Sequence, residues 1–155
     1  MKLSRLLLCF YLLLFSSTAF CRVRLPRLIS DGMVLQRGGS AKIWGWAAAN
    51  EKVTITFNGK TYSSTAGTDD KWAVTLSELK AGGPYEMEIT GSNSITLEDI
   101  LIGEVWVCSG QSNMDLPMSR VEERYTDVIA NSNNPAIRRF FVSRKYDHHN
   151  HGAAR

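Results

Sequence analysis

Ser112 is the residue whose surroundings best fit nucleophilic chemistry. It lies in the segment Ser109-Gly110-Gln111-Ser112-Asn113-Met114, directly after an apolar run that ends at Cys108. A serine hydroxyl is a weak nucleophile, so it needs a general base within reach and hydrogen-bond donors for the oxyanion that forms on attack. A turn between a strand and a helix would expose the hydroxyl and direct free backbone N–H groups toward the developing negative charge. Gly110 permits a sharp bend there.

The pattern around Ser112 is not that of the α/β-hydrolase nucleophile elbow. That motif is G-x-S-x-G, and Met114 occupies the position of its last glycine. A serine in a glycine-containing turn is also common without catalysis, so the local sequence leaves a nucleophile and a structural turn residue open. Gln111 and Asn113 likewise have two possible roles: they could support a catalytic turn, or they could be ordinary solvated turn residues.

Two predicted strands and a helix would position the serine. The run Ile100–Cys108 is nearly continuously apolar, which is typical of a buried strand in a parallel sheet. Apolar residues at helical spacing from Met118 to Ile129 predict an amphipathic helix with Pro117 in its first turn. Residues 131–135 break that helix, and Ile137–Val142 predicts a second strand. Strand, helix and strand make one βαβ unit, the opening of an α/β domain.

The region of residues 22–98 predicts a β-sandwich or jelly-roll-like domain. Val53, Ile55 and Phe57 alternate with threonines, which is the period of a half-buried strand. Asn58-Gly59 then predicts a tight hairpin turn, because both residues tolerate positive φ. Further short strands are predicted at Ala41–Trp46, Lys60–Ser63, Trp72–Leu76, Tyr85–Thr90 and Ser94–Leu97.

Three tryptophans of this region, Trp44, Trp46 and Trp72, have two interpretations. Exposed aromatic faces bind sugars, so they could form a carbohydrate platform. A small sandwich also needs large side chains in its core, and burial statistics favour that second interpretation.

The first 21 residues have the layout of a signal peptide. Lys2 and Arg5 precede an apolar run, Leu6–Phe15, that is followed by small residues. The run is about half of the ~20 residues that a membrane-spanning helix needs, so we expect no stable membrane insertion after cleavage. Secretion or a periplasmic location is therefore predicted. A lipid anchor at Cys21 is the less favoured alternative, because Phe20 is too bulky for a lipoprotein processing site.

Composition excludes some classes of function. The sequence has 155 residues, 44% of them hydrophobic and 21% charged, which is a globular balance. The formal net charge is +3, and two of those charges, Lys2 and Arg5, lie in an N-terminal segment without acids, which leaves +1 for the remainder. A nearly neutral body has no electrostatic footprint for nucleic acid. Cleavage after Cys21 leaves Cys108 alone, so no intramolecular disulfide is expected.

The segment Gly103–Met114 closely resembles the nucleophile block of sialate O-acetylesterases, which are SGNH-type serine esterases. Leu25–Arg37 looks like the opening segment of that family, and Gly82–Tyr85 with Gly91–Asn93 looks like its β-domain. The resemblance extends from about Val23 to about Tyr146. It implies a β-sandwich-like domain, 22–98, followed by the first βαβ unit of an SGNH-type α/β hydrolase domain, 99–146, and an atypical tail, 147–155.

The resemblance also implies an activity, the removal of O-acetyl groups from sialic acid or related acetylated sugars. Ser112 would attack the acetyl carbonyl, a histidine would take its proton, an aspartate would orient the histidine, and water would release acetate. The backbone N–H of Ser112 would be the first oxyanion donor, with Gly110, Gln111 and Asn113 supporting the turn. No metal or organic cofactor is implied.

The family's aspartate and histidine arrive on a late D-x-x-H segment, which we do not expect within 155 residues. Asp147-His148-His149-Asn150 has asparagine where that histidine should be. His148, His149 and His151 suggest a metal site at first sight, but adjacent histidines of an extended segment point to opposite faces, so a solvated end is favoured. The sequence after Tyr146 also departs from the family, which suggests a truncated or frame-shifted gene.

Two functions remain open at this point. The first is an esterase acting on O-acetylated sialic acid or, as in acetylxylan-type relatives, on another acetylated sugar. The second is a carbohydrate-binding or structural β-module without catalysis. We expect little acetate release by the chain alone, and residues 100–108 lying as an outer strand of the sandwich would count against the hydrolase interpretation.

Overall fold

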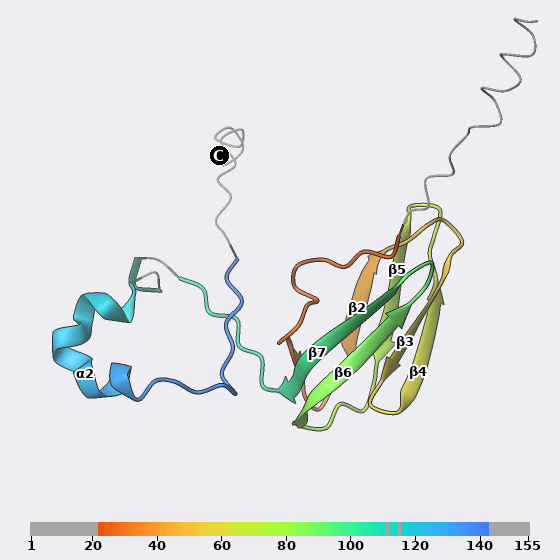
Figure 1. Cartoon of the computed structure of the whole chain (residues 1–155). Helices are drawn as coiled ribbons and strands as arrows, with labels where there is room; N and C mark the ends of the chain where they lie inside the picture. Colours follow the sequence, from red (N-terminus) through yellow and green to blue (C-terminus); the bar gives the residue numbers. More distant parts are fainter. Residues whose placement is uncertain (1–21, 111, 115, 143–155) are drawn as a thin grey trace, which may run out of the picture.

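The structure, a computed structural model, describes residues 22–110, 112–114 and 116–142. The predicted signal peptide, Gln111 and the tail with its three histidines lie outside the described residues. Strands fill the first part of the described chain and helical turns the second (Figure 1). The elements, in chain order, are β1 (Val34–Gln36), β2 (Ala41–Trp46), β3 (Lys52–Phe57), β4 (Lys60–Thr65), β5 (Lys71–Leu76), β6 (Gly82–Thr90), β7 (Ser94–Gly103), η1 (Ser112–Met114), η2 (Met118–Val121) and α2 (Glu122–Ala130).

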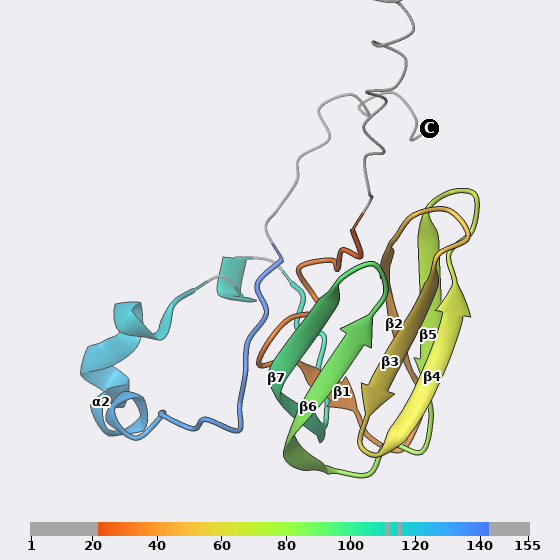
Figure 2. The same ribbon diagram turned by 45° about the vertical axis from the view of Figure 1, so that its right-hand side comes forward.

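The strands form two sheets that face each other as a sandwich (Figure 2). One sheet has the strand order β1-β7-β6-β3-β4, and the other consists of β2 and β5. All pairs are antiparallel except β1 and β7, which run parallel and pair Val34 with Leu101 and Gln36 with Gly103. The predicted β-rich region is therefore confirmed as mostly β-sheet.

Alternation of apolar and polar residues explains the core. In β3 the residues Val53, Ile55 and Phe57 are buried while the threonines between them are at least partly exposed. The same period places every second side chain of a strand on the inner face. The core is completed from both sheets and from the loops by Val23, Ile29, Leu35, Ile43, Ala47, Ala66, Trp72, Val74, Leu76, Leu79, Met87, Ile89, Leu97, Ile100 and Ile102.

The hairpin between β3 and β4 forms at the predicted turn. Asn58 and Gly59 have φ angles of 48° and 73°, the left-handed pair that a type I′ turn requires. Phe57 pairs with Lys60 across the turn. The register brings Ile55 opposite Tyr62, so the apolar face of β3 stays inside.

The apolar run of residues 100–108 differs from its prediction. Its first part, up to Gly103, belongs to β7, which continues through the predicted domain boundary between residues 98 and 99 and pairs with β6. The reason is that Ile100 and Ile102 alternate into the sandwich core, so burial on one face suffices to explain them. β7 is an inner strand between β1 and β6 rather than an outer one, and the chain leaves the sheet at Glu104.

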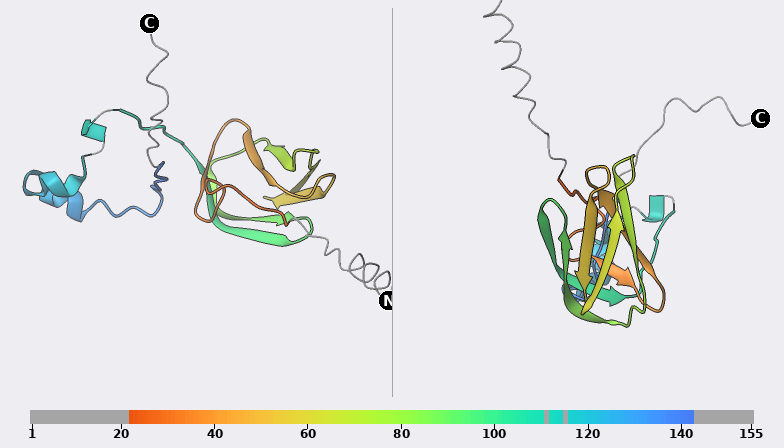
Figure 3. Two further views of the ribbon diagram at one scale, coloured as in Figure 1. Left: turned by 90° about the horizontal axis from the view of Figure 1, so that it is seen from above. Right: turned by 90° about the vertical axis from the view of Figure 1, so that its right-hand side faces the viewer.

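The second predicted strand of the βαβ unit is also absent from the described residues. Residues 137–142 have no strand pairing, because no other strand of the described chain lies beside them. The predicted helix is present as η2 and α2, with a non-helical residue at Tyr125, and it ends at Asn131 where the break was predicted. Figure 3 shows α2 to one side of the sandwich. No helix in the described ranges is long and apolar enough to cross a membrane.

Candidate active site

Ser112 lies at the start of η1, a single 3-10 turn, and is exposed. Gly110 precedes it at a crowded point, since a Cβ there would come within 2.5 Å of the Met114 Cγ. A side chain at position 110 would therefore require the exposed Met114 side chain to move. Asn113 is exposed within the same turn, and Gln111 lies outside the described residues. The nucleophile candidate is thus accessible on a sharp turn, but this turn does not follow a strand directly.

The groups that would activate Ser112 are not brought to it by the described residues. A general base must approach the hydroxyl to about 2.6–3.2 Å, and histidine serves most often. All three histidines, His148, His149 and His151, lie in the undescribed part of the sequence. Nor do the side chains within the described ranges include a cluster of three or more metal-binding groups. The described residues therefore place a candidate nucleophile without the groups that would activate it.

The segment that carries Ser112 is fixed to the sandwich where it leaves β7. Gln36, the last residue of β1, accepts a hydrogen bond from the Val105 N–H through its Oε1 atom (2.8 Å) and donates from Nε2 to Glu104 Oε2 (2.9 Å). Arg37 Nε forms an ion pair with Glu104 Oε1 at 2.5 Å. The hydrogen bond from Gln36 and then the Arg37 guanidinium lower the pKa of Glu104, because both stabilise its ionised form.

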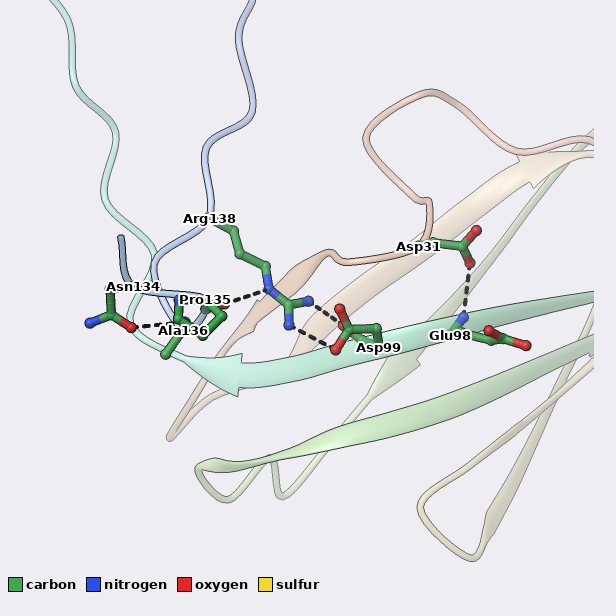
Figure 4. A network of polar contacts seen from close by, with 7 residues as sticks. All are labelled: Asp31, Glu98, Asp99, Asn134, Pro135, Ala136 and Arg138. Atoms are coloured by element: carbon green, nitrogen blue, oxygen red, sulfur yellow. Dashed lines mark hydrogen bonds and ion pairs between the residues drawn. The ribbon is translucent and has the colours of Figure 1, made fainter. Parts of the chain in front are cut away.

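A second attachment lies where the segment returns from α2. Figure 4 shows Arg138 reaching from the returning chain to Asp99 of β7. Its guanidinium donates to the Asp99 carbonyl and, from Nη2, to Asp99 Oδ1 at 2.8 Å. On the other side of Asp99, the Asp31 carboxylate accepts the Glu98 N–H at 2.9 Å. The segment is thus attached to Gln36 and Arg37 at its start, near Glu104, and to Asp99 of β7 at its return, through Arg138.

Between these attachments the chain exposes apolar side chains. Trp106 and Val107 are 83% and 92% exposed, and no residue described between Glu104 and Val142 is buried. Such exposure leaves this stretch available for contact with other surfaces. The others in this stretch are Val105, Met114, Leu116, Met118, Tyr125, Val128, Ile137, Phe140, Phe141 and Val142.

A shallow cavity of about 460 Å³ lies near the exit of the segment. Its lining comes from the loop after β1, the loop before β6 and Glu104. Ser112 does not line it. This cavity is therefore not a pocket beside the serine hydroxyl.

The tryptophans divide between the two interpretations. Trp72 is a core residue with 2% exposure, which confirms the packing interpretation for that side chain. Trp44 is partly buried and packs against the core. Trp46 is also partly buried, lies edge to face with Trp44 at 5.4 Å between ring centroids, and has the Arg24 guanidinium carbon 6.0 Å from its own centroid. Crossed rings of this kind do not form a flat platform.

Sequence reasoning missed the residues at the two attachments. Gln36, Arg37 and Glu104 lie inside segments that were singled out for their resemblance to a family, but nothing in the sequence pairs the two segments. The pairing of Arg138 with Asp99 has no local signal, since 39 positions separate the two residues.

Known proteins similar to this chain are esterases of acetylated carbohydrates. The sialate O-acetylesterase of Rattus norvegicus is 33% identical over 132 residues, which is 77% of this chain and 24% of that protein. The enzyme of Mus musculus is 34% identical over 83% of this chain and 26% of its own length. The crystal structure of a carbohydrate acetylesterase from Xanthomonas citri matches with a TM-score of 0.68 and 34% identity, covering 73% of this chain and 26% of that one. No protein-family model matches the chain.

These relatives confirm the expected resemblance to sialate O-acetylesterases, and they set its extent. The chain spans about a quarter of the length of the curated relatives it matches. The solved acetylesterase shows that the arrangement described here occurs within a larger enzyme of that class.

Proposed function

Because this chain is homologous to sialate O-acetylesterases over most of its own length, we propose that it contributes the nucleophile segment of a serine esterase that removes O-acetyl groups from sialic acid or a related acetylated sugar. The observation that supports the proposal most is this homology, which extends over both the sandwich and the Ser112 segment. An exposed serine on a glycine-containing turn is compatible with it.

In the proposed reaction Ser112 attacks the acetyl carbonyl carbon and forms an acetyl-enzyme. The histidine takes the Ser112 proton on attack and gives it to the leaving sugar oxygen, which departs as a hydroxyl, and water then cleaves the acetyl-enzyme to acetate. The backbone N–H of Ser112 stabilises the oxyanion, and Gly110, Gln111 and Asn113 shape the turn. A histidine and an aspartate outside the described residues complete the site. Residues from Glu104 onward belong, in this proposal, to an SGNH-type α/β hydrolase domain, and its other elements cover the exposed apolar stretch.

The substrate class within the proposal is an acetylated carbohydrate. O-acetylated sialic acid is the first choice because two relatives are named for it. An acetylated plant polysaccharide is the alternative, because the similar solved structure is named more broadly as a carbohydrate acetylesterase. The proposal includes no nucleic-acid partner and no cofactor.

We further propose a secreted or periplasmic location. It is supported by the basic start and short apolar run of the first 21 residues. Lipid anchoring at Cys21 is the less favoured form of the same export. In this location the enzyme would meet acetylated carbohydrate outside the cell.

A carbohydrate-binding or structural β-module is the second candidate function. The sandwich has its own buried core, whereas nothing described approaches Ser112 as a base. In that case the chain would bind acetylated carbohydrate without releasing acetate.

A chimeric enzyme tests the proposal. Residues 22–142 of this chain would replace the matching quarter of the Xanthomonas citri acetylesterase, and acetate release from a chromogenic acetyl ester would be measured. We expect Ser112→Ala to lower kcat about a thousandfold or more, as loss of a serine nucleophile does. Ser109→Ala, in the same segment, is the matched control and should retain activity within about threefold, since nothing assigns Ser109 a chemical role.

Equal activity of the Ser112→Ala and Ser109→Ala chimeras would remove Ser112 from the mechanism. If only Ser112→Ala is inactive, comparing acetate release from O-acetylated sialic acid and from acetylated xylan would identify the substrate class.

A further inference from the structure

The pairing of β1 with β7 continues past the ends of both strands through a side chain. The strand register ends with Gln36 opposite Gly103, and Arg37 N–H donates to the Gly103 carbonyl at 2.8 Å. Beyond this point the backbone of the first strand turns away at Gly38, which has a φ of 74° and donates to the Leu79 carbonyl. No main-chain acceptor of that strand is therefore left for the next residues after β7.

Gln36 supplies the missing acceptor. Its Oε1 atom receives the Val105 N–H at 2.8 Å, as a backbone carbonyl of β1 would have done. Its Nε2 atom donates to Glu104 Oε2 at 2.9 Å and to the Arg37 carbonyl at 3.2 Å. Both ends of the amide are thus engaged, which fixes its orientation, because oxygen and nitrogen cannot exchange places without losing these bonds.

We infer that Gln36 is a positioning residue for the nucleophile segment: its side-chain amide extends the β1–β7 pairing to Glu104 and Val105 and sets the direction in which the chain leaves toward Ser112. The inference deepens the proposed function and rests on it for the reactivity of Ser112. Little else in the described chain holds this stretch, since residues 104–110 are all exposed. Among the described residues, the Val105 bond to Gln36 is the one hydrogen bond that the backbone of residues 105–110 makes.

Hydrogen exchange of the Val105 amide in the 155-residue chain tests the inference. Gln36→Ala should lower the protection of Val105 about three- to tenfold, the effect of losing one hydrogen bond that water partly replaces. The protection of Ile55, a core amide of β3, should stay unchanged, which separates local release from loss of the fold. Glu86→Gln, a change at an exposed carboxylate of β6 outside this cluster, is the control and should leave both amides unchanged. Protection of Val105 that stays within twofold of wild type in Gln36→Ala would overturn the inference.

The variant Gln36→Glu provides a pH profile that a simple packing role would not produce. Above about pH 6 both carboxylates are ionised and repel, so the Val105 protection should be low. On acidification the pair binds a proton, and the neutral carboxyl can again accept from Val105 and donate to Glu104, so protection should recover. The wild type should show the opposite slope, because protonation of Glu104 on acidification, at its lowered pKa, weakens the hydrogen bond from Gln36 Nε2 that orients the amide, so protection should decrease. Protection in Gln36→Glu that does not change with pH would contradict the inference.

The exchange measurement needs no catalysis, so it separates the inference from the proposed function. If Gln36→Ala loses Val105 protection while the Ser112→Ala chimera stays active, the proposed function alone is overturned. In an active chimera, Gln36→Ala should lower kcat about three- to tenfold with KM within about twofold. An unchanged kcat together with lost protection would overturn the positioning role.

Discussion

The sandwich and the Ser112 segment differ in how their apolar residues are used. From Val23 to Ile102 the apolar side chains alternate with polar ones and close a core in which several residues are fully buried. From Glu104 to Val142 none of the described apolar side chains is buried and most are exposed, although the segment is comparably rich in them. The apolar side chains of the sandwich bury one another, whereas those of the segment are not buried by any part of the described chain.

This difference shows that packing among the described residues fixes the sandwich but not the segment from Glu104 to Val142. A helix as short as α2 is marginal by itself, and most helical stability comes from packing an apolar face. α2 has no buried residue and contains a non-helical residue at Tyr125. The two attachments, of Glu104 to Gln36 and Arg37 and of Arg138 to Asp99, therefore define the path of the segment more than its own packing does.

The largest effect on the free energy of unfolding is expected when one isoleucine from each region is replaced by alanine. Ile55→Ala should lower the free energy of unfolding of the sandwich by about 4 kcal/mol, because Ile55 is fully buried and the substitution leaves a cavity. Ile137→Ala should change it by less than about 0.5 kcal/mol, because Ile137 is 77% exposed. Urea denaturation followed by tryptophan fluorescence would measure both. Similar losses in the two variants would show that the segment has a core of its own.

An intermediate effect is expected at a close contact inside the sandwich. A Cβ on Gly45 would lie 2.2 Å from the Arg24 carbonyl oxygen and 3.1 Å from the Trp72 ring. Gly45→Ala should therefore cost about 2 kcal/mol of unfolding free energy through overpacking. Gly39→Ala is the control, since no atom lies within 4 Å of its added Cβ, and the same denaturation experiment should find it nearly neutral. A Gly45→Ala protein as stable as the control would mean that the chain around Arg24 can move away from β2 freely at this point.

The smallest effect on global stability is expected where the segment returns to β7. Arg138→Ala should change the unfolding free energy by less than about 1 kcal/mol, because its partner Asp99 is 60% exposed. The Ile137 amide, which donates to the Asn134 carbonyl beside this contact, should nevertheless exchange severalfold faster. Arg139→Ala removes the neighbouring exposed arginine and should leave that amide unchanged. Equal exchange in both variants would show that Arg138 does not hold the segment.

Much of the sandwich was predictable because its signals are local. The alternation in β3 and the pair Asn58-Gly59 each act over a few residues, and both gave the observed hairpin. β1 was not predicted, since three residues carry no periodicity and its partner β7 is distant in sequence. The run from Ile100 was assigned to the wrong sheet, because an apolar run alone does not show which strands will lie beside it.

The candidate site was predictable only as a position. The turn, its glycine and the exposed hydroxyl of Ser112 follow from short-range sequence, and its chemical role remains a proposal. The contact of Gln36 with Glu104 and Val105 joins segments that are almost 70 positions apart. Such contacts depend on the strand order of the folded sheet, which residue spacing does not encode.

The parallel pairing of β1 with β7 has a consequence for biosynthesis. β1 is made early, yet its only strand partner in the described chain emerges from the ribosome after all the other strands. Such distant pairing is slow to form, and an unpaired strand edge is prone to association in the meantime. β1 can join the edge of the large sheet only once residues 101–103 have emerged, and these residues emerge before the Ser112 turn, so the strand pairing that carries Gln36 can form ahead of the turn.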